Sequence, residues 1–397
     1  MPEYEWLWTR DNWTEFQFDS NALQRYNAVF AFNRENGSCP SIHFDPDDHS
    51  YNFAILSSEV VASSEIEGVK MHPESVVQSM RIQFDEIALH RPRTDDSDQR
   101  RSGIISAMID SYLTYDEPLS QDMLNHWNAL ITRDEEGLST KGTYRTHEDP
   151  MVITASARIT DDSASYIAPP SEKVPELMDD FIEWYNDTSP SGSNPLPPLI
   201  RSSLAHLYFV MIHPYEDGNG RMSRLIAEKA LSESYGKPTL VSLSHRIAET
   251  KGEYYEHLEN AARYGNIDGW MDYFCRTITE AQKLSAKKLQ KATLKMKIMD
   301  KHGDQLNPRQ EKLLEKMLHP SKGQFEKGIS YTKYARMNAN LFDKEISNNQ
   351  QALDDLDKMV DMGILIKPGD RKNSNYCLRG LGQARPTPTA QELRHTG

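Results

Sequence analysis

The sequence is poor in cysteine and in long apolar runs. Its three cysteines, Cys39, Cys275 and Cys377, lie far apart and form no Cys-x-x-Cys pair, which excludes a zinc knuckle or a disulfide framework. No run of about 18 apolar residues occurs, so we expect no segment that spans a membrane. The first residues are acidic and aromatic, so we expect no signal peptide and a reducing, cytoplasmic location.

Positive charge is also in deficit. The 397 residues contain 45 Lys and Arg against 59 Asp and Glu, a formal net charge of -14. A chain that coats nucleic acid or anionic membranes has the opposite balance, so we expect neither a membrane nor DNA as its main partner. Hydrophobic residues make up 38% and charged residues 26%, which is typical of a globular protein, and the length allows two or three domains.

Helical periodicity dominates the first 300 residues. In the segment 53–67, Phe53, Leu56 and Val60 lie on one side, and Gly68 follows where helices often end in the left-handed conformation. Short apolar runs between 142 and 168 instead predict two strands of a β-hairpin. The other expected helices cover 22–33, 73–90, 102–115, 120–132, 171–186, 199–212, 220–234 and 252–285. The predicted fold class is therefore mainly α.

The C-terminal third changes character. Seven lysines between 283 and 301 on helix-forming sequence predict a solvated helical connector. Helices at 308–318, 331–338 and 347–363, followed by a hairpin, predict a winged helix-turn-helix domain. We therefore expect a helical N-terminal region, a helical core, the connector, the winged-helix domain and a disordered tail, at 1–110, 111–282, 283–305, 306–380 and 381–397.

The chemically informative stretch is His-Pro-Tyr-Glu-Asp-Gly-Asn-Gly-Arg-Met-Ser-Arg at 213–224. An apolar helix runs into His213, and a Gly-Asn-Gly turn precedes a new helix that we expect to begin at about Gly220. Such a turn presents unpaired N–H groups and the positive end of a helix dipole to an anion. Arg221 and Arg224, spaced i, i+3, lie on one face and suit a polyphosphate.

Two further side chains of this stretch supply the remaining chemistry. Asp217 offers the carboxylate that a phosphate-bound Mg²⁺ needs. His213 is the group that takes up a proton near neutral pH. Taken singly, such a histidine, turn or arginine pair is more often structural. Their combination within twelve residues predicts a site for phosphoryl or nucleotidyl transfer.

Residues 213–224 resemble the Fic-domain signature His-Pro-Phe-x-(Asp/Glu)-Gly-Asn-Gly-Arg-x-x-Arg, with Tyr215 in place of the usual Phe. The segment from Gly-Thr-Tyr-Arg at 142–145 to Tyr-Ile-Ala-Pro-Pro at 166–170 resembles the approach to the Fic flap hairpin and its exit. Tyr-Tyr at 254–255 resembles a tyrosine pair that lies near the adenine in adenylylating Fic proteins. In those proteins an Asn often follows the pair, and Ala262 stands at that position here. The resemblance covers most of residues 1–380 and implies a helical Fic core with a β-hairpin flap.

The resemblance implies a protein adenylyltransferase, which moves AMP from ATP to a Ser, Thr or Tyr hydroxyl of a protein, itself included. His213 is then the base, Asp217 holds Mg²⁺, Arg221 contacts the β-phosphate and Arg224 the γ-phosphate. The flap strand, around Val152–Ala155, holds the target by strand addition. The implied ATP-binding residues are Glu67, Ile153, Thr154, His213, Asp217, Gly218, Asn219, Gly220, Arg221, Arg224, Tyr254 and Tyr255.

Residues 63–68, Ser-Ser-Glu-Ile-Glu-Gly, are similar to the inhibitory Fic motif (Ser/Thr)-x-x-x-Glu-(Gly/Asn). Glu67 falls in the last turn of a predicted helix, where the dipole disfavours a carboxylate. It therefore needs a cation, and the resemblance gives Arg224 as its partner. The alternative is an ordinary surface glutamate before a helix-ending glycine. The resemblance implies that Glu67 inhibits the enzyme.

Other functions stay open at the level of the sequence. The same site suits another nucleotide-type donor, or the removal of AMP from a modified protein, although two arginines favour a triphosphate. A DNA-binding regulator acting through 306–380 is a further alternative. The expected recognition helix of that domain carries four acidic residues and one lysine: Asp354, Asp355, Asp357, Asp361 and Lys358. Such a face would repel phosphates, which favours a protein-contacting role. A homodimer is compatible with the sequence.

Overall fold

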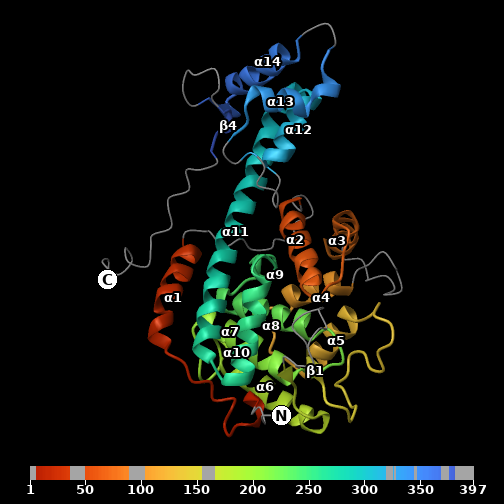
Figure 1. The fold of residues 1–397 in the computed structure, drawn as a ribbon, viewed down its shortest axis with the longest axis vertical. Coiled ribbons are helices and arrows are strands. Elements are labelled where there is room, and N and C mark those ends of the chain that lie inside the picture. Colours follow the sequence, from red (N-terminus) through yellow and green to blue (C-terminus); the bar gives the residue numbers. More distant parts are fainter. Residues whose placement is uncertain are drawn as a thin grey trace. The chain divides into compact units, whose positions relative to one another are not determined.

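The computed structural model describes residues 6–35, 50–88, 103–153, 166–318, 325, 328–343, 347–367 and 375–380. Thr154 and the tail at 381–397 lie outside these ranges. The described residues fall into two compact units, within Met1–Ser285 and Ala286–Pro386, and both are mainly helical (Figure 1). Across the described ranges, no helix combines the length and apolar character needed to cross a bilayer.

The first unit contains every helix expected between 22 and 234, close to its expected bounds. In chain order these are α1 (Ser20–Glu35), α2 (Ser50–Ile66), α3 (Pro73–Ala88), α4 (Gly103–Leu113), α5 (Gln121–Ile131), α6 (Val174–Asp187), α7 (Pro198–Ile212) and α8 (Asn219–Tyr235). Short 3-10 turns, η1 (Leu7–Thr9) and η2 (Ser171–Lys173), accompany them. Local periodicity and caps thus account for these elements.

The expectation of a single helix over 252–285 is wrong. The structure has α9 (Leu243–Glu249), α10 (Lys251–Tyr264) and α11 (Ile267–His302). Gly265 separates the last two, with a φ of 65°. Its N–H donates to the carbonyl of Ala261 at 3.0 Å, as in a left-handed helix end. Glycine takes this conformation without a clash of Cβ, so the chain turns there although the apolar pattern continues.

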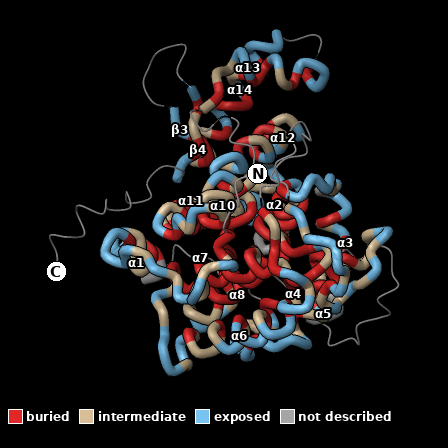
Figure 2. The backbone as a smooth tube through the Cα atoms, turned by 60° about the horizontal axis from the view of Figure 1, so that its bottom comes forward, coloured by how far each residue is buried: buried red, intermediate tan, exposed pale blue. Residues whose placement is uncertain are grey.

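Helices α7 and α8 form the centre of the first unit. Nearly every residue of α7 is buried (Figure 2), because a helix that is apolar on most sides must be enclosed. It packs along α8 and against α6 and α1. Within this core Arg201 pairs with Glu233 of α8 at 2.6 Å, which compensates a buried charge. The two helices therefore give the loop between them a firmly packed base.

The two short strands expected between 142 and 168 are present. They are β1 (Val152–Ile153) and β2 (Tyr166–Ile167), which pair antiparallel with Val152 opposite Ile167 and Ile153 opposite Tyr166. The residues between the strands, 154–165, lie outside the described ranges. The pairing places Ile153 and Tyr166 opposite each other, and both line the cleft described below.

The second unit follows the predicted order of three helices and a hairpin. Its elements are η3 (Gly303–Gln305), α12 (Pro308–Met317), α13 (Tyr331–Met337), η4 (Ala339–Leu341), α14 (Asn348–Asp361), β3 (Leu365–Ile366) and β4 (Cys377–Leu378). Strands β3 and β4 pair antiparallel, and Ile329 forms a β-bridge with Tyr376.

One expectation for a charged residue in this part of the chain is wrong. Asp355 does not belong to an exposed acidic face. It is buried, pairs with Arg309 of α12 at 2.7 Å and accepts a hydrogen bond from the Tyr334 hydroxyl of α13. Asp355 lies on the stripe of α14 that faces the other helices, so it joins three helices instead of facing solvent. Of the seven lysines of the connector, five are exposed, and Lys288 and Lys291 are buried.

Candidate active site

The loop between α7 and α8 carries the first half of the motif at 213–224, and the first turns of α8 carry the second half. His213 follows α7 with a left-handed φ of 52°, and its N–H donates to the carbonyl of Phe209 at 3.1 Å. Gly218, with a φ of 85°, precedes α8, which begins at Asn219 and not at Gly220. A left-handed conformation is uncommon for a residue other than glycine, and tertiary contacts must hold it.

Two side chains outside the motif hold this loop. Arg145 donates from Nε to the carbonyl of His213 at 2.8 Å. Asn128 donates from Nδ2 to the carbonyl of Asp217 at 2.9 Å and accepts the N–H of Gly142 at 2.9 Å. Arg145 is the last residue of the Gly-Thr-Tyr-Arg segment at 142–145. Its place in that segment was the sequence feature that could have indicated its role. Nothing in the local sequence indicates the role of Asn128.

Asn219 also shapes the loop. Its Oδ1 accepts the N–H of Tyr215 at 3.0 Å, and its Nδ2 donates to the carbonyl of Tyr215 at 2.8 Å. The N–H of Gly218 is likewise engaged, by Oδ1 of Asp217 at 2.6 Å. The Asn219 side chain is therefore committed to the loop, which leaves its backbone N–H as its contribution to an anion site.

His213 is oriented as a proton acceptor. Its Nδ1 lies 3.2 Å from the carbonyl oxygen of Val210. A carbonyl oxygen only accepts, so Nδ1 carries the proton and Nε2 keeps its lone pair. Burial lowers the pKa of His213 to about 4, so the imidazole is neutral at physiological pH. This tautomer and charge are those of a general base.

The N-terminus of α8 faces the carboxylate of Glu67. Gly218, at the N-cap, offers no side chain to the first turn of α8. Glu67 directly follows α2, and a Cβ on Gly220 would collide with its carboxylate. The absence of a side chain at Gly220 therefore lets an anion approach the positive end of the helix dipole. In this structure the anion is Glu67.

Glu67 also forms the ion pair with Arg224 that the sequence predicts. Its Oε1 lies 2.9 Å from Nη1 of Arg224. Ser63 of α2 engages the rest of the guanidinium, since its Oγ accepts from Nε at 3.2 Å and its carbonyl from Nη2 at 2.9 Å. Arg224 is only 1% exposed. The end of α2 thus encloses the arginine to which the resemblance assigns the γ-phosphate.

Arg221 and Asp217 contact each other at the same loop. Nη2 of Arg221 lies 3.2 Å from Oδ2 of Asp217, and Nη1 lies 3.0 Å from Oε1 of Glu135. The side chain of Asp217 is 48% exposed. Within the described ranges, no three His, Cys, Asp or Glu side chains cluster as a metal site. A lone exposed carboxylate fits the mode in which Mg²⁺ is bound mainly by phosphate and water.

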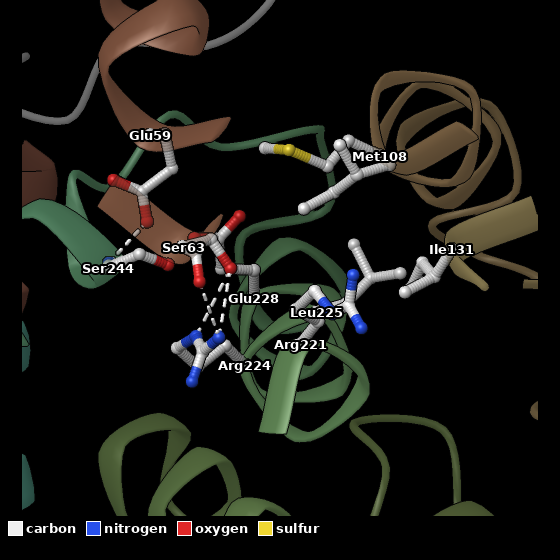
Figure 3. A pocket seen from close by; sticks show the side chains of 10 residues that line it. Glu59, Ser63, Met108, Ile131, Arg221, Arg224, Leu225, Glu228 and Ser244 are labelled. Carbon is white, nitrogen blue, oxygen red and sulfur yellow. Dashed lines mark hydrogen bonds between the residues drawn. The ribbon is translucent and has the colours of Figure 1, made fainter. Parts of the chain in front are cut away.

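A cavity with an empty volume of about 290 Å³ lies beside Arg224 (Figure 3). Two acidic side chains, Glu59 and Glu228, are among the residues that line it. Glu59 of α2 accepts the backbone N–H groups of Ser244 and His245 at the start of α9. Burial and the neighbouring Glu59 raise the pKa of Glu228 in α8 well above its ordinary value. Glu228 therefore keeps its proton and donates it towards Glu59, which links α2 to both α8 and α9.

One cleft collects several of the predicted ligand-binding residues. Its empty volume, open mouth included, is about 620 Å³. The predicted residues that line it are Glu67, Ile153, His213, Gly220, Tyr254 and Tyr255. The other lining residues are Tyr166, Val210, Met211, Leu258, Glu259 and Ala262, and of these the sequence had drawn attention to Tyr166 and Ala262. The predicted residues that do not line it are Asp217, Gly218, Asn219, Arg221 and Arg224, and Thr154 lies outside the described ranges.

The tyrosine pair forms one wall of this cleft. The hydroxyl of Tyr254 lies 3.1 Å from Nε2 of His206 in the core. The hydroxyl of Tyr255 donates to the carbonyl of Ile66, the last residue of α2, at 3.3 Å. The two rings are 5.1 Å apart and pack edge to face. Tyr255 therefore connects the cleft wall to the helix that carries Glu67.

Comparisons with known proteins agree with these features. Residues 118–231 match the model of the Fic/DOC family, and residues 6–85 match a domain of unknown function, DUF4172. The chain is 28% identical over 155 residues to protein adenylyltransferase fic-1 of Caenorhabditis elegans, which covers 37% of this chain and 28% of that protein. It is 31% identical over 121 residues to protein adenylyltransferase Fic of Drosophila grimshawi, which covers 30% and 23%.

A crystal structure of a Fic family protein from Desulfovibrio desulfuricans G20 superposes with a TM-score of 0.47 and 17% identity, over 92% of this chain and 96% of that one. The chain spans less than a third of the length of the two curated relatives above. Residues 118–231, which match the Fic/DOC family model, contain the whole motif at 213–224, and the chain is similar over 155 and 121 residues to proteins named protein adenylyltransferase.

Proposed function

We propose that the protein is a protein adenylyltransferase that transfers AMP from ATP to a hydroxyl of a protein side chain. One observation carries the proposal: a single cleft is lined both by neutral His213 and by Gly220 at the N-terminus of α8. A base beside an anion site is what attack of a hydroxyl on a phosphate requires. Similarity to proteins named protein adenylyltransferase supports the assignment.

In the proposed reaction, Nε2 of His213 accepts the proton of a Ser, Thr or Tyr hydroxyl. The hydroxyl oxygen attacks the α-phosphorus of ATP and forms a new P–O bond. The bond between the α-phosphorus and the oxygen that bridges to the β-phosphate breaks, and pyrophosphate leaves with the electron pair. Such a transfer depends on positioning and on stabilisation of charge. The first-turn N–H groups of α8 and the guanidinium of Arg221 would supply both.

Asp217 is the residue we propose to hold Mg²⁺ together with the phosphates. Its side chain is about half exposed, and its contact with Arg221 is 3.2 Å long, so a metal–phosphate complex can compete for it. Bound Mg²⁺ neutralises charge on the phosphates. Arg221, once released from Asp217, would turn to the β-phosphate, and Arg224 would hold the γ-phosphate.

We propose that the acceptor segment lies along β1. Among the described strands β1 pairs with β2 alone, and Val152 is 50% exposed. An added strand gains main-chain hydrogen bonds with little demand on its sequence. Ile153 of the same strand lines the cleft. A protein segment bound there, from this chain or another, would bring its hydroxyl towards His213.

Glu67 is proposed to keep this site inactive. Its carboxylate lies both at the N-terminus of α8 and on Arg224. One side chain therefore fills the places proposed for the terminal phosphates of ATP. ATP bound beside it would have a displaced tail and a poorly aligned α-phosphate, so the carboxylate must move before transfer.

The test uses a Glu67→Gly variant incubated with Mg²⁺ and ATP labelled on the α-phosphate. We expect label in the protein and a mass increase of one AMP group. His213→Ala in the same background should abolish transfer and retain ATP binding. Equal transfer with and without His213 would overturn the mechanism. Competition by other nucleotides, and incubation of the modified protein without ATP, separate a different donor and removal of AMP from the proposed reaction.

A further inference from the structure

We propose that Arg145 is a positioning residue, which holds His213 and the β1–β2 hairpin in one fixed arrangement so that a hydroxyl presented along β1 meets Nε2 of His213. The inference rests on the proposed function, because it concerns how acceptor and base are aligned in the same site. Arg145 lies on the segment that leads into β1 and is 1% exposed. It lies outside the motif at 213–224, and the sequence assigned it no role in transfer.

The guanidinium of Arg145 contacts both the motif and the chain that leaves the hairpin. Nε donates to the carbonyl of His213 at 2.8 Å. Nη2 donates to the carbonyl of Pro169, two residues after β2, and Nη1 donates to Oγ of Ser171 at 2.8 Å. The backbone N–H of Arg145 donates to the carbonyl of Pro214 at 2.9 Å. Arg145 therefore joins the entry of the hairpin, its exit and the start of the motif.

The end of α7 explains why a cation is favourable at this place. The last carbonyls of a helix have no partner within it and carry the negative end of the helix dipole. The carbonyl of Met211 accepts the hydroxyl of Tyr166 in β2 at 2.6 Å, and the carbonyl of Ile212 accepts Nη2 of Arg145 at 3.4 Å. The hairpin and the segment before it are thus fastened directly to the helix end that His213 follows.

Arg145 is also a buried charge without a carboxylate to balance it. Within the described ranges, its guanidinium is held by carbonyl and hydroxyl oxygens and forms no ion pair. Burial lowers the pKa of Arg145 to about 10, so the side chain stays charged at neutral pH. A buried cation without a counter-charge is costly, and an apolar side chain would pack there at a lower cost. The cost points to a use for the charge and for its directed hydrogen bonds.

The charge of Arg145 acts on the base. Burial is the largest cause of the lowered pKa of His213, and the positive charge of Arg145 lowers this pKa further. The carbonyl of Val210 and the carboxylates of Glu67 and Asp217 have the opposite effect. The other titratable side chains that line the cleft with His213 are Tyr166, Tyr254, Tyr255 and Glu259. Removal of the Arg145 charge should therefore raise the pH at which His213 becomes protonated.

The test measures rate, affinity and titration in the Glu67→Gly background. Self-modification with Mg²⁺ and ATP gives the rate, calorimetry gives the Kd of ATP, and NMR, assigned with His213→Ala, gives the titration midpoint of His213. Arg145→Lys keeps the charge and loses the fixed set of donors. Self-modification should fall about a hundredfold, as when reacting groups shift by about 1 Å, with little change in the Kd of ATP or in the midpoint. Arg145→Gln removes the charge, and the midpoint should rise.

Two further variants separate alignment from loss of packing. Ser171→Ala removes the hydroxyl that Nη1 of Arg145 contacts and leaves the contacts with the end of α7. Self-modification should fall about tenfold with an unchanged midpoint, and this variant decides if Arg145→Lys does not fold. Arg201→Lys is the matched control, because Arg201 is equally buried, belongs to α7 and pairs with Glu233. It should lower stability and leave the rate per folded molecule and the midpoint unchanged.

The three measurements decide between this proposal and the proposed function. Undiminished self-modification in Ser171→Ala overturns the link to the hairpin, and an equal loss in Arg201→Lys shows that packing alone is responsible. An unchanged midpoint in Arg145→Gln overturns the effect of the charge on His213. Absence of transfer in the Glu67→Gly parent refutes the proposed function, whereas a midpoint that rises in Arg145→Gln and not in Arg201→Lys still supports the hold of Arg145 on His213.

Discussion

The carboxylate of Glu67 lies 2.9 Å from Nη1 of Arg224 and also against Gly220 at the N-terminus of α8. The helix behind it is anchored separately, because Ser63 engages Arg224 and Glu59 accepts N–H groups at the start of α9. Under the proposed function, movement of the end of α2, or of the Glu67 side chain alone, would therefore be enough to expose Gly220 and the N-terminus of α8 to phosphate. The rest of α2 can stay in place.

Glu67→Gly should raise the rate of AMP transfer roughly a hundredfold. Each tenfold change in rate corresponds to about 1.4 kcal/mol of activation free energy. The reason is that the substitution removes the anion that competes with the terminal phosphates. Self-modification, followed by mass spectrometry at matched ATP and Mg²⁺, measures the effect.

The controls for this prediction distinguish removal of the Glu67 carboxylate from destabilisation of the end of α2. Glu65→Gly, at an exposed position of the same helix end, should not activate. Arg224→Ala should not activate either, because it removes the partner of Glu67 and a phosphate contact together. Activation by Glu65→Gly would show that the helix end, and not the carboxylate, restrains the site.

Ser63→Ala should lower the free energy of unfolding by about 1–3 kcal/mol, because it leaves the buried Nε–H of Arg224 without an acceptor, while Nη2 keeps the Ser63 carbonyl. The Ser63 hydroxyl accepts from both Nε and Nη2 of Arg224. Ser64→Ala is the matched control, because among the described residues the Ser64 hydroxyl donates only to the weakly accepting sulfur of Met71. Urea unfolding of the two variants provides the measurement, and equal stability would mean that Ser63 does not support Arg224.

Transfer should stay active at a lower pH than an ordinary histidine base allows. Burial lowers the pKa of His213 to about 4, so the neutral, accepting form persists as the pH falls below 6.5. In the Glu67→Gly background, kcat/KM should be nearly constant from about pH 7.5 to pH 5.5 and fall only below that range. The initial rate of modification at each pH gives the profile. Loss of half the activity near pH 6.5 would contradict this environment for His213.

Glu228→Gln should flatten the pH dependence of stability. The pKa of Glu228 is raised well above the ordinary 4.5, so the folded protein binds this proton more tightly than the unfolded chain does. The resulting stabilisation is fully present below about pH 4.5 and is lost as the pH rises towards the raised value. An amide mimics the protonated carboxyl at every pH. The free energies of unfolding of variant and parent should therefore differ least near pH 4.5 and most near pH 8. A difference that stays constant with pH would refute the assignment.

Asp217→Asn should lower Mg²⁺-dependent transfer roughly a hundredfold, as expected when a charge-stabilising group is removed. The amide oxygen can still accept the N–H of Gly218, a contact of 2.6 Å, so the loop keeps its shape. Activity titrated against Mg²⁺ tests the prediction. An unchanged response would show that Asp217 does not hold the metal.

Much of this site could be predicted because its features are local in sequence. The helix end at His213, the glycine turn, the i, i+3 arginines and the left-handed Gly68 each follow from a few neighbouring residues. The helices up to α8 follow from periodicity for the same reason. The Glu67–Arg224 contact was predictable because a carboxylate at a helix end needs a cation and the resemblance supplied one.

Other features depended on contacts between distant segments. Asn128 holds the loop from 89 positions away, and the link of Glu228 to Glu59 joins two helices. The break at Gly265 escaped prediction because the apolar pattern continues across it. The sequence placed Asp355 on an acidic helix face, whereas in the fold it is buried and links three helices.

The sequence by itself determined which chemical groups are available to this protein: a histidine, a glycine-rich helix start, two arginines and a carboxylate lie within two short segments. Only the tertiary structure decided which of these groups share one cleft and what else lines it. Glu259 lines the cleft because α10 packs there, and Arg145 meets both His213 and the exit of the hairpin because those segments pack together. Local patterns specify turns and helix faces, whereas packing of distant elements specifies which faces meet.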